Sequence, residues 1–292
     1  MKGVLVLAGP TSAGKTAVAL AVAERFGAVV LSADAMQVYR RLDIGTGKAT
    51  SAERARVPHE GLDLVEPDEP FSAGDFVTLG DRVIGAHARV IVAGGTSLYL
   101  RSLLRGLVRT PPVDPELRAE LEARDDLHAA LQSIDPPLAK RLHPADRVRL
   151  IRGIEVFRLS GRRLSDLHAE HACAPDRIAH RALWLDRDDL YERIDARVIG
   201  MVEAGWVAEV QAVLDAGFAP TLKPLQSLGY RHLCAHLLEG LPLDETIRRT
   251  QRDTRHFSRK QRTWMRGLGY PRLVDDPLDT ALKWAEDLWG PA

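Results

Sequence analysis

The stretch that decides the fold of this chain is Gly9-Pro10-Thr11-Ser12-Ala13-Gly14-Lys15-Thr16. It fits the pattern G-x-x-x-x-G-K-[ST], follows the apolar run Val4–Ala8 and opens the amphipathic run Lys15–Arg25. A strand, a glycine-rich loop and a helix in this order predict a P-loop, where backbone N–H groups and the helix N-terminus hold phosphate. All eight residues are therefore predicted to bind a diphosphate or a nucleotide. Lys15 is expected to contact the outer phosphate, and the Thr16 hydroxyl is expected to bind Mg²⁺.

The chain around this loop alternates between two patterns. Apolar runs that indicate buried strands lie at Ala28–Ser32, Arg89–Ala93 and Ala182–Leu185, and helical patterns such as Phe76–Ala88 separate them. Strands that alternate with helices form a parallel sheet with right-handed crossovers. We therefore predict an α/β fold, with a P-loop NTPase-like core whose parallel sheet is flanked by helices.

A second part of the chain contains helical patterns only. The alternation of strand and helix patterns stops at Thr110-Pro111-Pro112. From Pro115 to about Leu167 the sequence shows successive amphipathic helical patterns, which are interrupted at prolines. This indicates an all-helical insertion domain. We predict three segments: 1–112 as the first part of the core, 113–178 as the helical insertion, and 179–292 as the completion of the core with a helical, basic C-terminal part.

Charge is distributed unevenly along a neutral chain. The 292 residues contain 40 Lys and Arg and 40 Asp and Glu, yet Arg248–Arg266 holds eight basic residues and one acid, Asp253. Lys140–Arg163 holds eight basic residues and two acids. Because salt screens charges beyond about 10 Å, such segments can bind a polyanion on a neutral protein.

Two absences narrow the class of protein. Cys173 and Cys234 form neither a zinc motif nor a disulfide framework, and no apolar run approaches the length of a membrane span. We expect a cytoplasmic protein with no membrane segment.

The motifs alone leave the reaction open. The run Ala28–Ser32 is followed by an acid, Asp34, whereas Arg89–Ala93 is followed by Gly94-Gly95-Thr96 without one. An acid after a strand can help a P-loop protein to hold Mg²⁺ and position a nucleophile. A kinase of a small metabolite therefore remains possible at this point.

Blocks of sequence beyond the P-loop carry a resemblance to one family. Ser32-Ala33-Asp34-Ala35-Met36-Gln37-Val38-Tyr39, followed by Asp43-Ile44-Gly45-Thr46, resembles the tRNA dimethylallyltransferase family, and the likeness continues along almost the whole chain. The further blocks are Val57-Pro58-His59, Phe71-Ser72-Ala73-Gly74-Asp75-Phe76, Ala93-Gly94-Gly95-Thr96-Ser97-Leu98-Tyr99, Arg149 with Arg152-Gly153-Ile154-Glu155-Val156, Leu228-Gly229-Tyr230-Arg231, and Arg259-Lys260-Gln261-Arg262-Thr263-Trp264. Cys173 and Cys234 lie far apart in sequence and in no CxxC pattern, so they do not form the C-terminal C2H2 zinc finger of eukaryotic members, which favours the bacterial type.

The resemblance implies a reaction. A dimethylallyl group moves from dimethylallyl diphosphate to N6 of adenine 37 beside the tRNA anticodon, and pyrophosphate leaves. Asp34 is implied as the base that takes the N6 proton, and Thr96 as a contact at the reaction centre. The structural alternative for Thr96 is the N-cap of a helix over Ser97–Leu104. Arg118 is implied at the active-site entrance, and Lys15, Thr16 and Mg²⁺ stabilise the leaving diphosphate.

The resemblance also implies contacts to the anticodon stem-loop of tRNA. We expect the amide of Gln37 to read a base edge, and the C-terminal cations to bind phosphates because they have almost no acidic partners nearby in sequence. For Phe257 and Trp264 we favour packing in the core over stacking on bases. The expected tRNA contacts are Asp34, Ala35, Met36, Gln37, Thr96, Arg118, Val148, Arg149, Leu150, Ile151, Arg152, Gln226, Gly229, Tyr230, Arg231, Arg259, Lys260, Gln261, Arg262, Trp264 and Arg266.

Four positions depart from the family pattern. Ala35, Glu60, Ser97 and Val148 replace its usual Ser, His, Gly and Gln, which puts fine contacts at these side chains in doubt. We expect a monomer. An isopentenyltransferase that acts on free AMP, ADP or ATP is the alternative within the same fold, but it needs no basic segment to clamp tRNA.

Overall fold

The computed structural model describes residues 3–173 and 175–292, which form two compact units. The first unit joins Met1–Leu104 with Arg177–Ala292, and the second is Arg105–Asp176. No helix in the described part of the chain is long and apolar enough to cross a membrane.

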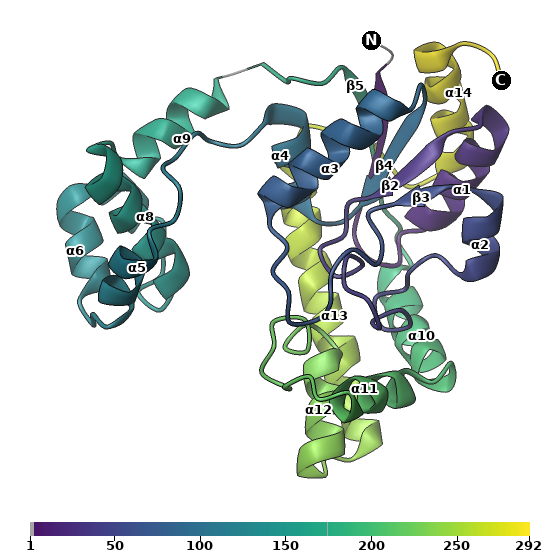
Figure 1. The fold of residues 1–292 in the computed structure, drawn as a ribbon. Helices are drawn as coiled ribbons and strands as arrows, with labels where there is room; N and C mark the ends of the chain where they lie inside the picture. The colour runs from purple at the N-terminus through teal and green to yellow at the C-terminus, as the bar shows by residue number, and fades with distance from the viewer. Residues whose placement is uncertain (1–2, 174) are drawn as a thin grey trace. The chain divides into compact units, whose positions relative to one another are not determined.

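The first unit is built on a six-stranded parallel sheet with the strand order β3-β2-β4-β1-β5-β6 (Figure 1). This arrangement confirms the predicted α/β fold with a P-loop core. The strands are β1 (Val4–Ala8), β2 (Val29–Ser32), β3 (His59–Glu60), β4 (Val90–Gly94), β5 (His180–Leu185) and β6 (Arg272–Leu273).

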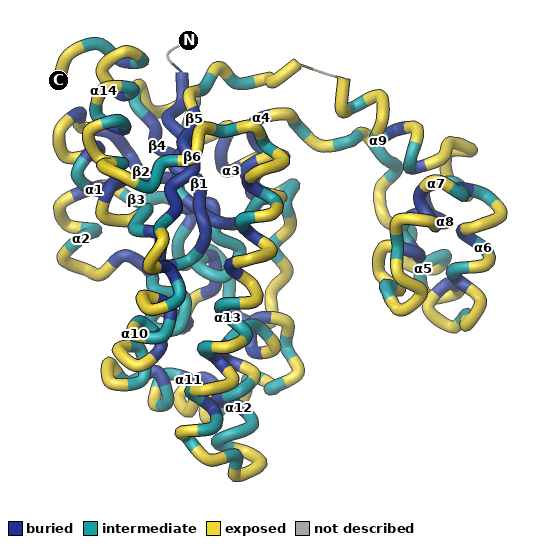
Figure 2. Tube along the Cα trace, turned by 180° about the vertical axis from the view of Figure 1, so that it is seen from behind, coloured by how far each residue is buried: buried dark blue, intermediate teal, exposed yellow. Residues whose placement is uncertain are grey.

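Helices cover both faces of the sheet, so β1 is buried on both sides (Figure 2). Leu5 and Leu7 pack with α1 (Lys15–Phe26) and α14 (Pro277–Trp289) on one face. On the other face, Val4 and Val6 pack with α3 (Ala73–Ala86) and α4 (Ser97–Arg105). A short helix, α2 (Ser51–Arg56), follows β2 along the chain.

The P-loop, Asp34 and Thr96 follow three neighbouring strands and lie at one edge of the sheet. In the parallel register Ala8 of β1 lies beside Gly94 of β4, and Ser32 of β2 lies beside Ala93. The loops that leave β1, β4 and β2 therefore start side by side at the carboxyl edge, where ligands bind in open α/β sheets.

Four further helices belong to the first unit. They are α10 (Leu190–Glu203), α11 (Trp206–Asp215), α12 (Tyr230–Glu239) and α13 (Leu243–Arg266). Trp206, Val210 and Tyr230 form a separate apolar cluster with Val38 and Leu42 from the loop after β2. This cluster ties the C-terminal helices to the loop that carries Asp34.

The second unit contains α5 (Pro115–Glu122), α6 (Leu127–Ile134), α7 (Pro136–Ala139), α8 (Arg147–Ser160) and α9 (Leu164–Ala172). Leucines such as Leu121, Leu131 and Leu150 form its own apolar core. The buried carboxylate of Asp135 accepts hydrogen bonds from the backbone N–H groups of Leu138 (3.2 Å) and Ser165 (2.9 Å), which fixes the break between α6 and α7.

The bounds of this unit differ from the segment 113–178 expected for the insertion. At the start, Arg152 donates to Thr110 Oγ1 (2.6 Å) and to the Pro111 carbonyl (2.8 Å), so the proline segment packs with the helices. At the end, Arg177 pairs with Asp81 at 2.6 Å, which holds it to the first unit.

The sequence pattern over Leu190–Ala216 is helical, and the structure divides this stretch into two helices, α10 and α11. Gly205 between them adopts φ +100, a left-handed conformation that ends the first helix. The break allows α11 to turn and contribute Trp206 to the cluster beside the sheet edge.

Gly94 offers a test of how tightly the edge is packed. A Cβ at this position would lie 2.2 Å from the Ala33 carbonyl oxygen, which is backbone and cannot easily move. We expect Gly94→Ala to lower the free energy of unfolding by about 1–3 kcal/mol, as overpacking does. Gly85 on α3 is the control, because a Cβ there would meet nothing within 4 Å. Gly85→Ala should be neutral or raise stability by about 0.4–1 kcal/mol. Denaturant unfolding of both variants compares them, and equal effects would contradict the close approach.

Candidate active site

The P-loop adopts a conformation that depends on left-handed residues. Gly9 has φ +152 and Gly14, at the N-cap of α1, has φ +93. A Cβ at Gly9 would lie 2.4 Å from the Leu185 carbonyl oxygen on β5, so only glycine allows the loop to leave the sheet here. Ser12 also has a positive φ, +63, and its buried hydroxyl has no hydrogen-bond partner within the described protein. The loop therefore offers polar groups to a ligand.

Lys15 is a half-buried cation whose charge is poorly balanced by the protein. Its ammonium group donates to the Pro10 carbonyl at 2.7 Å. Burial lowers the pKa of Lys15 to about 8; Asp34 opposes this shift, and Arg197 adds to it. A bound anion would restore the charged form, because an opposite charge within a few ångströms raises the pKa of an amine.

Arg197 is a site residue that the sequence interpretation missed. It lies on α10 and lines the same cavity as Lys15 and Asp34. Burial lowers the pKa of the Arg197 guanidinium, and Asp34 partly opposes this. Among the described residues it has no ion-pair partner. A signal existed in the sequence: Arg197 lies three residues from Ile194 and next to Val198, both buried, which places a charge beside the apolar face of its helix.

Asp34 and Thr96 are held together by the backbone. The Thr96 hydroxyl accepts a hydrogen bond from Ala35 N at 3.0 Å, and Thr96 N donates to the Ala33 carbonyl at 3.1 Å. Asp34 Oδ1 accepts from Met36 N at 2.8 Å. The other carboxylate oxygen, Oδ2, has no hydrogen-bond partner within the described residues. Thr96 thus joins two loops, and Asp34 keeps one oxygen available to a ligand.

Gln261 on α13 connects the P-loop to the loop after β4. Its side-chain oxygen accepts from Thr11 N at 3.1 Å, and its amide nitrogen donates to the Gly95 carbonyl at 3.1 Å. The side chain is buried. The structure therefore gives this predicted tRNA contact a role inside the protein, where it holds two phosphate-side loops in place.

The amide of Gln37 also has partners within the protein. Its oxygen accepts from the Ser32 hydroxyl at 2.7 Å, and its nitrogen donates to the carbonyls of Thr46 and Gly47, both at 3.1 Å. A base edge would have to compete with these bonds. Gln37 nevertheless lines the cavity described next.

One cavity of about 870 Å³ brings most of the first unit's predicted site residues together. The lining includes Lys15 and Thr16 of the P-loop together with Arg197, and Asp34 and Thr96 at the strand ends. The lining also includes residues of the C-terminal helices and the loop before them, namely Trp206, Gln226, Tyr230, Arg231, Phe257, Lys260, Gln261 and Trp264. Such a volume suits a ligand of the size of a diphosphate with a base beside it.

The C-terminal cations have more acidic partners than the sequence suggested, which corrects the expectation that they are almost unpaired. The acids come from other segments of the fold or from the helix itself. Arg262 contacts the buried Asp186 at 2.9 Å, Arg255 pairs with Asp195, and Arg231 pairs with Asp253. Lys260 and Arg266 are exposed and have no such partner among the described residues.

The aromatic residues of the same helix differ from each other. Phe257 is 42% exposed and lines the cavity, so the expectation that it packs in the core was wrong. Trp264 is half-buried against the apolar cluster of α3 and α4, yet it too lines the cavity. Arg259 lies over the ring of Tyr191, with its guanidinium 5.7 Å from the ring centre.

The predicted contacts on the helical unit fall into three groups. Arg118 and Arg152 both bind the fully buried carboxylate of Glu155, at 3.1 and 2.5 Å. Val148 and Arg149 are exposed at the start of α8. Leu150 and Ile151 are buried in the unit's core, so their side chains do not reach a ligand, and the expectation of tRNA contacts by these side chains is corrected.

Comparisons with known proteins agree on one family. Residues 37–268 match the model described as IPP transferase, and residues 2–60 match that of isopentenyl transferase. The chain is 48% identical to tRNA dimethylallyltransferase 1 of Syntrophotalea carbinolica, across 89% of this chain and 87% of that protein. It is 42% identical to tRNA dimethylallyltransferase of Geobacter metallireducens, across 95% and 96%.

Solved structures give the same result. The full-length tRNA isopentenylpyrophosphate transferase of Bacillus halodurans has a TM-score of 0.70 and 30% identity, with 99% of this chain and 96% of that chain covered. A eukaryotic dimethylallyltransferase acting on tRNA has a TM-score of 0.80 and 27% identity, with 91% and 70% covered. The chain therefore belongs to the IPP transferase family, the family of the tRNA dimethylallyltransferases.

Proposed function

We propose that this protein transfers a dimethylallyl group from dimethylallyl diphosphate to N6 of adenine 37, beside the anticodon of tRNA. The observation that carries the proposal is the single cavity that joins the P-loop, Asp34 and Thr96 to an exposed cation and aromatic side chains of α13. The named relatives are tRNA dimethylallyltransferases, which favours tRNA over a free nucleotide or a metabolite as the acceptor.

The donor's diphosphate fits the phosphate side of the cavity. Lys15 and Arg197 supply two cations there, and the P-loop supplies backbone N–H groups and the unpartnered Ser12 hydroxyl. Negative charge that develops on the leaving diphosphate is stabilised by such preorganised donors. Arg193 donates to the Ser12 carbonyl at 3.2 Å, which supports the loop from outside.

The residues present fit a magnesium ion held mainly by the substrate. No cluster of three or more His, Cys, Asp or Glu side chains that could hold a metal occurs in residues 3–173 and 175–292. Mg²⁺ typically binds through one or two protein oxygens, several waters and substrate phosphates. The Thr16 hydroxyl would hold it, with Asp34 close by in the same cavity. When bound, the ion would offset negative charge on the diphosphate.

The acceptor needs help because the lone pair of N6 is delocalised into the adenine ring. In the proposed step N6 attacks the allylic carbon, the carbon–oxygen bond to the diphosphate breaks, and its electrons leave with pyrophosphate. The N6 proton passes to Asp34, whose Oδ2 is available for it. Thr96 fixes the backbone of this loop through its bond to Ala35 N.

The base can reach Asp34 only if it leaves the anticodon stack. Phe257 and Trp264 offer aromatic surface for stacking along the cavity, and Lys260 offers a cation without an ion-pair partner in the described protein. Val148 and Arg149 are the exposed candidates on the helical unit. In this proposal Arg262, which pairs with Asp186, stabilises the protein and does not bind tRNA.

Mass spectrometry of RNA tests the proposed activity directly. The protein, Mg²⁺ and dimethylallyl diphosphate are incubated with an anticodon stem-loop that carries adenine at position 37. We expect a mass gain of one dimethylallyl unit on this RNA, and none on a stem-loop with another base at 37. Modification of AMP in preference to the RNA would contradict tRNA as the acceptor.

Asp34→Asn tests the proposed base. Asparagine keeps the shape of the side chain but cannot take the proton, so we expect turnover to fall by about 10²–10⁴-fold while stem-loop affinity stays near that of the parent. Asp68→Asn, at an exposed loop position, is the matched control and should leave turnover unchanged. Normal turnover with a collapsed affinity would identify Asp34 as a binding residue.

The pKa of Lys15 predicts how diphosphate binding depends on pH. Because this pKa is about 8, the ligand-free protein loses the charge of Lys15 as the pH rises past that value. We expect affinity for inorganic pyrophosphate, measured by calorimetry between about pH 7 and 10, to fall along this range. Lys15→Arg should flatten the fall, since a guanidinium stays protonated there. Equal pH slopes in the two proteins would count against Lys15 as the titrating group.

A further inference from the structure

Glu209 on α11 holds a loop that is distant in sequence. Its Oε2 accepts hydrogen bonds from Asp43 N at 2.7 Å and from Ile44 N at 2.6 Å. Its Oε1 accepts from Gly45 N at 3.2 Å and from the Tyr230 hydroxyl at 2.7 Å. One carboxylate thus satisfies three consecutive backbone donors and a phenol at the start of α12.

The parts that Glu209 joins are packed too closely to move independently. A Cβ at Gly45 would lie 2.0 Å from Trp206 Nε1 and 2.6 Å from Tyr230 Cζ. A Cβ at Gly229, which has φ +80, would lie 2.0 Å from Trp206 Cη2. The rings of Trp206 and Tyr230 meet edge to face, with centres 5.4 Å apart. The loop, α11 and the start of α12 therefore form one packed wall.

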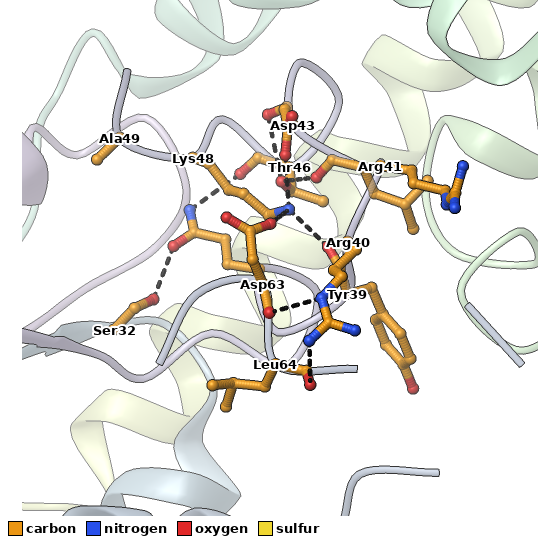
Figure 3. A network of polar contacts seen from close by, with 12 residues as sticks. Ser32, Tyr39, Arg40, Arg41, Asp43, Thr46, Lys48, Ala49, Asp63 and Leu64 are labelled. Carbon is orange, nitrogen blue, oxygen red and sulfur yellow. Dashed lines mark hydrogen bonds and ion pairs between the residues drawn. The ribbon is translucent and has the colours of Figure 1, made fainter. Parts of the chain in front are cut away.

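Other side chains fasten the remaining parts of the same loop. Lys48 is buried, and its ammonium donates to Asp43 Oδ1 and Asp63 Oδ1, both at 2.6 Å, and to the Tyr39 carbonyl (Figure 3). Gln37 donates to the carbonyls of Thr46 and Gly47. The backbone N–H groups of 43–45 are the part of the loop that only Glu209 holds by side-chain hydrogen bonds in the described structure.

The wall forms part of the lining of the cavity that also contains Lys15 and Thr16 of the P-loop. Gly45, Thr46 and Gly47 line the cavity together with Trp206 and the segment that includes Gln226, Leu228, Tyr230 and Arg231. Glu209 itself does not line it, so it acts on a ligand only through the wall. Burial, and then Glu209, raises the pKa of Tyr230 well above 10, so this phenol remains a hydrogen-bond donor to the carboxylate.

We propose that Glu209 is a positioning residue for the acceptor: it fixes the wall of the cavity against which the anticodon stem-loop binds. This inference rests on the proposed function and specifies which side of the cavity receives the RNA. The diphosphate side is held by other contacts, through Lys15, Gln261 and Arg193. Loss of Glu209 should therefore affect the two ligands differently.

Glu209→Gln is the test, because an amide has one oxygen to accept bonds and turns an N–H group toward donors. The affinity for an anticodon stem-loop should fall by about tenfold, the effect expected for losing bonds to a charged group. The affinity for inorganic pyrophosphate should stay within about twofold of the parent. Hydrogen exchange of a peptide over residues 43–45 should quicken in the same variant. Glu203→Gln makes the same chemical change at an exposed position of α10 and should alter neither affinity.

Each outcome decides the proposal. Unchanged stem-loop affinity in Glu209→Gln would overturn it, as would loss of both affinities in proportion to a fall in melting temperature, since that would show a merely structural role. Glu209→Asp keeps the negative charge, but its shorter side chain places the carboxylate farther from the loop, so the stem-loop affinity should be intermediate. If the Gln variant does not fold, the same affinities are measured with the Asp variant. A parent protein that fails to bind or modify the stem-loop would refute the proposed function itself.

Discussion

Lys15 and Arg197 bring two positive charges into a largely buried space that contains one nearby carboxylate, Asp34. Moving charges out of water is costly unless they are paired, and burial lowers the pKa of both cations here. A polyanion in the cavity removes this imbalance. The packing of the core holds these three groups close together in the absence of the proposed ligand, a diphosphate.

Close backbone packing makes that arrangement rigid. At the end of β1, Gly9 packs closely against the Leu185 carbonyl, and at the end of β4, Gly94 packs closely against the Ala33 backbone. This packing restricts the movement of the loops that follow these adjacent strands. Gln261 then connects the first loop to the second by two hydrogen bonds of 3.1 Å. Because Gln261 lies on the same helix as Lys260 and Phe257, the helix that supports the phosphate loops also carries side chains along the cavity.

Much of the core could be predicted because local patterns determined it. The strand Val4–Ala8 has the predicted bounds, and β2, β4 and β5 lie within two residues of theirs, since each is an apolar run between turn residues. The two-residue strands β3 and β6 carry too few residues to show a period. Gly205 was overlooked as a helix break because a single glycine within a helical pattern is often tolerated.

The site could be predicted only where a motif marked it. Lys15 and Asp34 lie in distinctive blocks, whereas Arg197 and Glu209 lie in ordinary amphipathic helices, where a charge is usually solvated. Their roles depend on tertiary neighbours: Glu209 binds backbone groups 164 to 166 residues away. The same limit applies to the ion pairs of α13. Asp186 and Asp195 pair with cations of this helix but lie far from it in sequence, so a local count of charges could not predict these pairs.

The pairing of these cations bears on how a polyanion is recognised. A cation held by a buried acid, such as Arg262 by Asp186, contributes little net field outside the protein, because its partner cancels most of it. Among the described residues, the basic side chains of Arg248–Arg266 that lack an acidic partner are Arg259, Lys260 and Arg266. They are fewer than the sequence suggests, so charge alone gives weak selectivity for one RNA site. In the proposed reaction, selectivity comes from shape, because the extruded base fits between the Asp34 loop and the wall built on Trp206 and Tyr230. Under this proposal, the rigidity of that wall, and with it the carboxylate of Glu209, matters more to acceptor choice than the number of basic residues.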